Sequence, residues 1–172
     1  EPVKWDIKTE KSDENIDIYF TAHIDKGFHL YSLDVPEDGP LPTEFIFEDT
    51  KGFKPVGDAV EISTPIEEFA DVFELDIKFF EEEDTFRQTI KLTSGNEAVP
   101  VIGEIAYMVC NDVGCVALYE DIELTFNGQT GELITGSDAS LLPDEASIAS
   151  SDIQGKKAGL WGFFIIAFIS GL

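Results

Sequence analysis

One stretch decides the fold: residues 104–126, with the sequence EIAYMVCNDVGCVALYEDIELTF. Apolar residues alternate with polar or smaller ones on both sides of the tetrapeptide Asn111-Asp112-Val113-Gly114. Asn and Asp tolerate left-handed backbone angles and Gly adopts positive φ freely, so these four residues favour a turn. Two alternating runs joined by a four-residue loop that contains Gly predict a β-hairpin.

The two cysteines of the chain, Cys110 and Cys115, flank this turn. In the predicted hairpin they form the first pair of the ladder. Directly opposed residues of an antiparallel pair have Cα atoms about 4.5–5.5 Å apart, and a disulfide tolerates that separation. The sequence therefore predicts that the two sulfurs can bond without any movement of the backbone.

Two roles for this disulfide are open. A ring of about six residues gives only roughly 2 kcal/mol of stabilisation in the chain-entropy model, where a loop of about 100 residues would give nearer 5. Because the turn residues already hold the strands together, a bond at an exposed hairpin end is well placed to be made and broken. Many secreted sandwiches nevertheless carry one inert disulfide, so a structural role stays possible.

Composition limits the partners of the chain. Its 172 residues fit one domain of ordinary size with a tail. The 11 basic and 35 acidic residues leave a formal charge of −24, which repels phosphate backbones and anionic lipid. We therefore expect no nucleic-acid binding.

Apolar residues recur at a period of two along most of the chain. The clearest strand has an apolar face made of Ile16, Ile18, Phe20, Ala22 and Ile24. Further strands are expected around residues 3–7, 28–31, 45–47, 75–79, 86–92 and 101–109. The Pro- and Gly-bearing segment 34–42 is expected to be a surface loop. About eight or nine short strands without a helix predict an antiparallel β-sandwich.

The composition changes after Phe126. Residues 127–157 are rich in Gly, Ser, Thr, Asp and Ala and are expected to form a flexible linker. Residues 158–172 (AGLWGFFIIAFISGL) are uncharged, and apolar residues lie on all sides of a helix drawn from them. A membrane-spanning helix needs about 20 residues. We therefore expect the first part of a transmembrane helix here, with Trp161 near the interface; a buried tail is the alternative.

Together these features resemble the amino-terminal part of the DsbD family, the bacterial membrane thiol:disulfide interchange proteins, in a variant of the Bacteroidetes type. The resemblance covers residues 3–126 and 160–172. Its most specific pieces are GFHLYS at residues 27–32, the run from Tyr107 to Cys115, and the beginning of the predicted membrane helix.

The resemblance implies an immunoglobulin-like redox domain over residues 1–126, in the periplasmic part of a bacterial inner-membrane protein. Such a domain accepts electrons from a thioredoxin-like domain and reduces periplasmic partners, such as a disulfide isomerase or a cytochrome c maturation thioredoxin. It uses no cofactor and no metal. Cys110 and Cys115 would be the redox pair, and in relatives the later cysteine, here Cys115, forms the intermolecular bond.

The resemblance also implies a loop whose aromatic residue caps the cysteines. Phe73 is the best match for this residue and Phe69 is the second choice, both in the acidic segment that contains Asp71 and Glu74.

A second aromatic segment, with His29 and Tyr31, matches the one that lies beside the active site in relatives. Many relatives also have Pro soon after the second cysteine. Here Val116-Ala117-Leu118 follows it, which leaves the shape of the partner-docking surface open.

Negative charge near the cysteines bears on their reactivity. A carboxylate close to a thiol disfavours the thiolate, and no Lys or Arg occurs between Lys91 and Lys156. We therefore expect thiol pKa values at or above the free value. The acidic residues nearest in sequence are Glu104, Asp112, Glu120 and Asp121.

Other chemistries find little support. The spacing of His23 and His29 from the cysteines matches no zinc pattern. No nucleophile-elbow, zinc-protease or phosphate-binding motif is present in the sequence. Two hypotheses remain: a protein-disulfide reductase domain of a larger membrane enzyme, or a non-catalytic immunoglobulin-like binding or assembly module with a structural disulfide.

Overall fold

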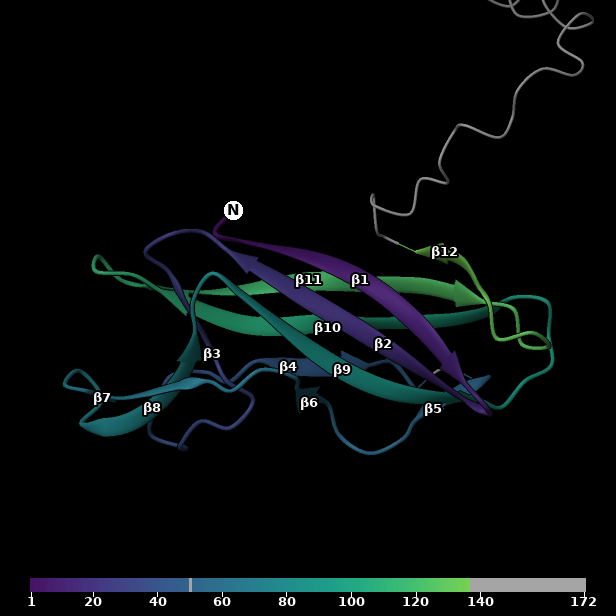
Figure 1. Ribbon diagram of the computed structural model, residues 1–172, viewed down its shortest axis with the longest axis horizontal. Coiled ribbons are helices and arrows are strands. Elements are labelled where there is room, and N and C mark those ends of the chain that lie inside the picture. The colour runs from purple at the N-terminus through teal and green to yellow at the C-terminus, as the bar shows by residue number, and fades with distance from the viewer. Residues whose placement is uncertain (50, 137–172) are drawn as a thin grey trace, which may run out of the picture. The chain divides into compact units, whose positions relative to one another are not determined.

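A computed structural model of the protein describes residues 1–49 and 51–136 (Figure 1). In this part of the chain it contains twelve β-strands and no helix. The strands form two sheets, and every pairing between neighbours is antiparallel. The predicted all-β architecture of antiparallel sheets is therefore confirmed.

The first sheet has the strand order β1-β2-β9-β5, with β6 also paired to β9. Its strands are β1 (Val3–Ser12), β2 (Asn15–Ile24), β5 (Phe53–Pro55), β6 (Val60–Glu61) and β9 (Glu83–Leu92). The second sheet has the order β12-β11-β10-β3-β8-β7, with β4 also paired to β10. Its strands are β3 (His29–Tyr31), β4 (Glu44–Phe47), β7 (Ile66–Ala70), β8 (Leu75–Phe80), β10 (Val99–Cys110), β11 (Cys115–Phe126) and β12 (Leu133–Gly136).

The main core contains buried residues from both sheets. The apolar face predicted for β2 is buried over its whole length, because alternate residues of a strand point to the same side. Phe86 of β9 is fully buried among aromatic rings, with centroids 5.9, 5.4 and 5.7 Å from those of Trp5, Phe45 and Phe80.

Strand β10 has a partner along each edge. One edge pairs with β11 from Val99 to Cys110. The other edge is shared, because β4 pairs with residues 103–106 and β3 with Val109 and Cys110. Gly103 permits the close approach of β4, since a Cβ there would collide with the carbonyl oxygen of Ile46.

Several short strands differ from the sequence-based expectation. The loop at residues 34–42 contains no strand, as predicted. Strands β5, β6 and β7 lie in segments that showed no alternation, and their side chains are mostly exposed. Strand β12 pairs with β11, so residues 133–136, predicted to belong to the linker, extend the sheet instead.

The remaining predicted linker (137–157) and the predicted membrane helix (158–172) lie outside the described residues. Within residues 1–49 and 51–136, no helix is long and apolar enough to cross a membrane.

The aromatic core around Phe86 generates a stability prediction. We expect Phe86→Ala to lower the free energy of unfolding by about 3–5 kcal/mol, because it leaves a cavity between the sheets. The matched control is Phe69→Ala on β7, where the side chain is 60% exposed and the expected change is within about 0.5 kcal/mol. Urea unfolding of the two variants measures both values, and similar losses would contradict this account of the core.

Candidate functional site: the disulfide at the end of the β10–β11 hairpin

The hairpin turn is closed by Asn111. Its backbone N–H donates to the carbonyl oxygen of Gly114 at 3.0 Å. Its side-chain Oδ1 accepts hydrogen bonds from the backbone N–H groups of Val113 at 2.9 Å and Gly114 at 3.1 Å. These bonds complete the turn that the sequence predicted and fix the register of the strands that follow.

Cys110 lies directly opposite Cys115 in this register, and the two form a disulfide. Their Cα atoms are 4.0 Å apart, somewhat closer than the range expected for opposed residues. The predicted pairing is therefore confirmed.

The two sulfur-bearing residues differ in burial. Cys110 is only 6% exposed, whereas Cys115 is an exposed residue at the first position of β11. Attack on a disulfide requires access to the sulfur under attack. A thiolate approaching from solution therefore reaches Cys115 and not Cys110.

Cys110 belongs to a small cluster that is distinct from the main core. Neighbouring residues on a strand face opposite sides of the sheet, so Val109 joins the main core whereas Cys110 does not. We call the second group the outer cluster. Its buried members are Tyr31, Ile77, Phe79 and Cys110, and Val35, Ala70, Phe73, Leu75 and Met108 pack against them.

The β7–β8 hairpin contributes the predicted capping residue to the outer cluster. Its turn is closed by the N–H groups of Phe73 and Glu74, which donate to the carbonyl oxygen of Ala70 at 3.1 and 2.8 Å. Glu74 takes the left-handed conformation that the turn requires, with φ of 56°. The ends of the β7–β8 and β10–β11 hairpins lie at the same end of the domain, on the left in Figure 1.

The structure distinguishes the two candidate Phe residues. Phe73 is partly buried and packs on the cluster that contains Cys110. Phe69 is 60% exposed and is not part of this cluster. Asp71 and Glu74 are exposed on the turn beside Phe73.

His29 and Tyr31 also lie beside the disulfide, because β3 pairs with the end of β10. His29 is opposite Cys110, and Tyr31 is opposite Phe79 of β8. The His29 ring stacks on Phe79 with centroids 4.4 Å apart, and its Nε2 lies 2.8 Å from Oε1 of Glu81. Tyr31 is buried, and burial raises the pKa of its hydroxyl. The contact with Glu81 depends on the pairing of β3 with β8, which no local sequence pattern predicts.

Fewer carboxylates lie near the disulfide than the sequence predicted. Only Asp112 lies in the hairpin turn itself. Glu120 is opposite Ile105, and five residues of strand separate it from Cys115 by about 16 Å, well beyond the screening length of about 8 Å at physiological salt. Burial, with the charges of Glu1 and Asp121, raises the pKa of Glu120. Its carboxyl, and those of its neighbours, therefore act little on the sulfurs.

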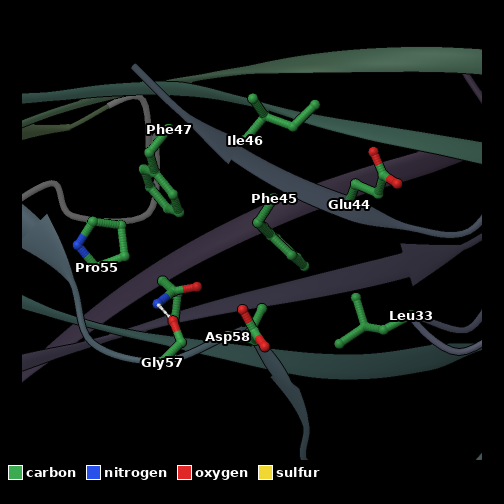
Figure 2. Close-up of a pocket in the computed structure, with 10 residues that line it drawn as sticks. Leu33, Glu44, Phe45, Ile46, Phe47, Pro55, Gly57 and Asp58 are labelled. Carbon is green, nitrogen blue, oxygen red and sulfur yellow. Dashed lines mark hydrogen bonds between the residues drawn. The ribbon is translucent and has the colours of Figure 1, made fainter. Parts of the chain in front are cut away.

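A separate pocket of about 420 Å³ lies away from the cysteines (Figure 2). Phe45 and Phe47 point into it from β4, and the Gln88 side-chain amide donates to the carbonyl oxygen of Gly57 at 3.1 Å. None of the predicted site residues lines it. Its lining comprises Leu33, Glu44, Phe45, Ile46, Phe47, Pro55, Gly57, Asp58, Ala59 and Gln88.

No protein-family model matches the chain, and no curated protein matches it. Among solved structures, the amino-terminal periplasmic domain of ScsB from Proteus mirabilis superposes with a TM-score of 0.50 at 15% identity. The match covers 75% of this chain and 47% of that chain. This chain therefore shares its fold with part of that ScsB structure.

A second similar structure is the amino-terminal domain of Neisseria meningitidis DsbD in the reduced form, with a TM-score of 0.42 and 15% identity. That match covers 75% of this chain and 89% of the other. The superposition on the ScsB domain supports the predicted resemblance at the level of the fold alone. The chain spans about half the length of the ScsB structure, and the narrower Bacteroidetes assignment stays a prediction.

The unequal burial of the cysteines predicts unequal reactivity after reduction. We expect a brief pulse of iodoacetamide to label Cys115 at least about tenfold faster than Cys110, because access limits the reaction of a shielded thiol. Mass spectrometry of peptides from the full chain measures the ratio. The same pulse in denaturant should label both equally, and equal labelling of the folded chain would contradict the assignment of Cys115 as the accessible sulfur.

Proposed function

We propose that this domain is a periplasmic thiol:disulfide interchange module that reduces disulfides of partner proteins through Cys110 and Cys115. The observation that carries the proposal is a disulfide with one exposed and one shielded cysteine at the end of a hairpin. An exposed sulfur can form a mixed disulfide with a partner, and a shielded neighbour can resolve it.

The exchange runs in two balanced steps. In the reduced domain, the Cys115 thiolate attacks a partner disulfide, so that a mixed disulfide forms and one partner sulfur leaves as a thiolate. The Cys110 sulfur then attacks Cys115, which restores the intramolecular disulfide and releases the second partner sulfur. The partner gains two electrons and two protons, and the domain loses them. A thioredoxin-like domain would supply electrons for the next cycle by the reverse steps.

The energetics of the hairpin support this reversible use. The disulfide closes a ring of about six residues and contributes only about 2 kcal/mol in the chain-entropy model. The Asn111 turn and the β10–β11 ladder bring the two cysteines together without it. Reduction therefore leaves the surrounding sheet in place for the next exchange.

The wider setting is proposed from the family resemblance. The acceptor would be a periplasmic disulfide isomerase or a cytochrome c maturation thioredoxin. Residues 158–172 would anchor the domain in the inner membrane, and the whole would act as a protein-disulfide reductase. The periplasmic origin named for the ScsB structure agrees with this location.

A redox titration of the full chain tests the proposed function. We expect the Cys110–Cys115 disulfide to equilibrate with dithiothreitol or glutathione buffers at a potential of about −270 mV or higher, as in exchange proteins. Thiol labelling followed by mass spectrometry measures the reduced fraction. A potential below about −300 mV is typical of structural disulfides and would favour the non-catalytic binding module instead.

We further propose that Phe73 shields Cys110, the buried half of the disulfide, until a partner displaces it. Its partly buried ring packs on the cluster that contains Cys110, and it sits on a hairpin turn flanked by the exposed Asp71 and Glu74. A short turn of this kind can move without a change in the main core, as gating loops do.

Removal of the Phe73 ring should expose the Cys110 thiol. Losing the packing of a half-buried Phe costs about 1 kcal/mol, so in a Cys115→Ser background Phe73→Ala should speed the reaction of the Cys110 thiol with dithionitrobenzoate roughly fivefold. Stopped-flow absorbance measures the rate. Phe69→Ala is the matched control and should leave the rate unchanged. Equal rates with and without Phe73→Ala in that background would remove the capping role while leaving the redox titration unaffected.

A further inference from the structure

A row of four side chains crosses the outer face of the second sheet at the disulfide. In the ladder, His29 pairs with Cys110, and Cys110 pairs with Cys115. Opposed residues lie on the same face with Cβ atoms about 4.5–5.5 Å apart. The register of β3 with β8 pairs Leu30 with Phe80 and so continues to Glu81, whose carboxylate lies 2.8 Å from His29 Nε2. The order across the sheet is carboxylate, imidazole, sulfur, sulfur.

Two contacts fix the imidazole in this row. Stacking on Phe79 sets the plane of the ring, and Glu81 binds one of its nitrogens. A carboxylate at Nε2 assigns the hydrogen to that nitrogen and leaves Nδ1 to exchange a further proton. The His29 side chain is 37% exposed, so the ring can also exchange protons with water.

The charges around the site make this imidazole distinctive. Most titratable groups on the elements that surround His29 and Cys110 can only become negative or stay neutral, among them Glu81, Tyr31, Asp112, Asp71 and Glu74. Lys78 of β8 is paired with Asp34 at 2.7 Å. Negative neighbours oppose a thiolate. Among the described residues of these elements, His29 is thus the group beside Cys110 that can become positive and so favour the Cys110 thiolate.

We propose that His29 exchanges a proton with the Cys110 sulfur during disulfide exchange, with Glu81 as the residue that positions its ring. This role rests on the proposed interchange function and adds an acid–base group to it. A residue that acts as a base in one direction must act as an acid in the reverse direction.

The proton and electrons balance in each direction. When a donor thiolate attacks Cys115, the donor–Cys115 bond forms and the Cys110–Cys115 bond breaks. Cys110 leaves with the electron pair, and protonated His29 gives it a proton and later regains one from water. In the reverse direction, neutral His29 takes the proton from the Cys110 thiol as that sulfur attacks the mixed disulfide and releases the partner thiolate.

The two histidines of the chain provide a matched pair of variants. His23 is on β2, between Asp6 at 2.7 Å and Glu83 at 3.1 Å, and so has a similar acidic setting away from the disulfide. His29→Phe keeps an aromatic ring to stack on Phe79, whereas it removes the proton-exchanging group. His23→Phe removes the other imidazole by the same change.

The experiment is the reduction of the oxidised full chain by dithiothreitol from mildly acidic to mildly alkaline pH. At about pH 6, where imidazole is largely protonated, His29→Phe should be slower than the wild type by on the order of tenfold, at the low end of acid–base contributions. The deficit should vanish at alkaline pH, where a neutral imidazole has no proton to give. His23→Phe should match the wild type at every pH.

A second measurement separates an acid–base role from a structural one. In the Cys115→Ser background, His29→Phe should change the titration of the Cys110 thiol, as followed by thiolate absorbance, because a proton shared with an adjacent imidazole couples the two titrations. A deficit that is the same at all pH values, or an unchanged Cys110 titration, would overturn the proposal. A disulfide that no buffer opens would refute the interchange function itself, which is a distinguishable outcome.

Discussion

The register between β10 and β11 is the constraint on which the rest of the site depends. A shift of one residue would separate Cys110 from Cys115 and would exchange the two faces of β11. Two features hold the register: the hydrogen bonds of Asn111 in the turn and the buried side chains of Ile122, Leu124 and Phe126 at the other end. The same register directs Val109 to the main core and places Cys110 in the outer cluster.

The parts of the site that are close in sequence could be predicted from it. The turn residues, the alternation on each side and the spacing of the cysteines are all contained in one stretch, so the hairpin and the disulfide followed from local rules. The strands that pair with the other edge of β10 could not be predicted from the sequence, because long-range packing decides whether β3 or β4 lies there. His29 was placed at the site by family resemblance alone, and its contact with Glu81 was missed.

The strands that the sequence did not predict were missed for one physical reason. Strands β5 and β6 have two or three residues, and β12 follows a polar turn, so none of them shows a sustained period of two. Their positions come from pairing with the long strands β9 and β11. The choice between Phe69 and Phe73 was similarly undecided, since both lie in one acidic segment. The left-handed backbone of Glu74 forms the turn beside Phe73, and composition does not reveal it.

Two separate clusters of apolar side chains explain how a stable domain can contain a disulfide that is reversibly reduced. The main core joins the two sheets and determines the stability of the fold. The outer cluster contains Cys110 and Phe73 and lies on the opposite face of the second sheet. Regions with few buried contacts open at lower free energy than the core. Movement of the β7–β8 turn can therefore uncover Cys110 while the main core stays packed. Because β10 and β11 pair along their whole length, the bonded and reduced states can share one backbone.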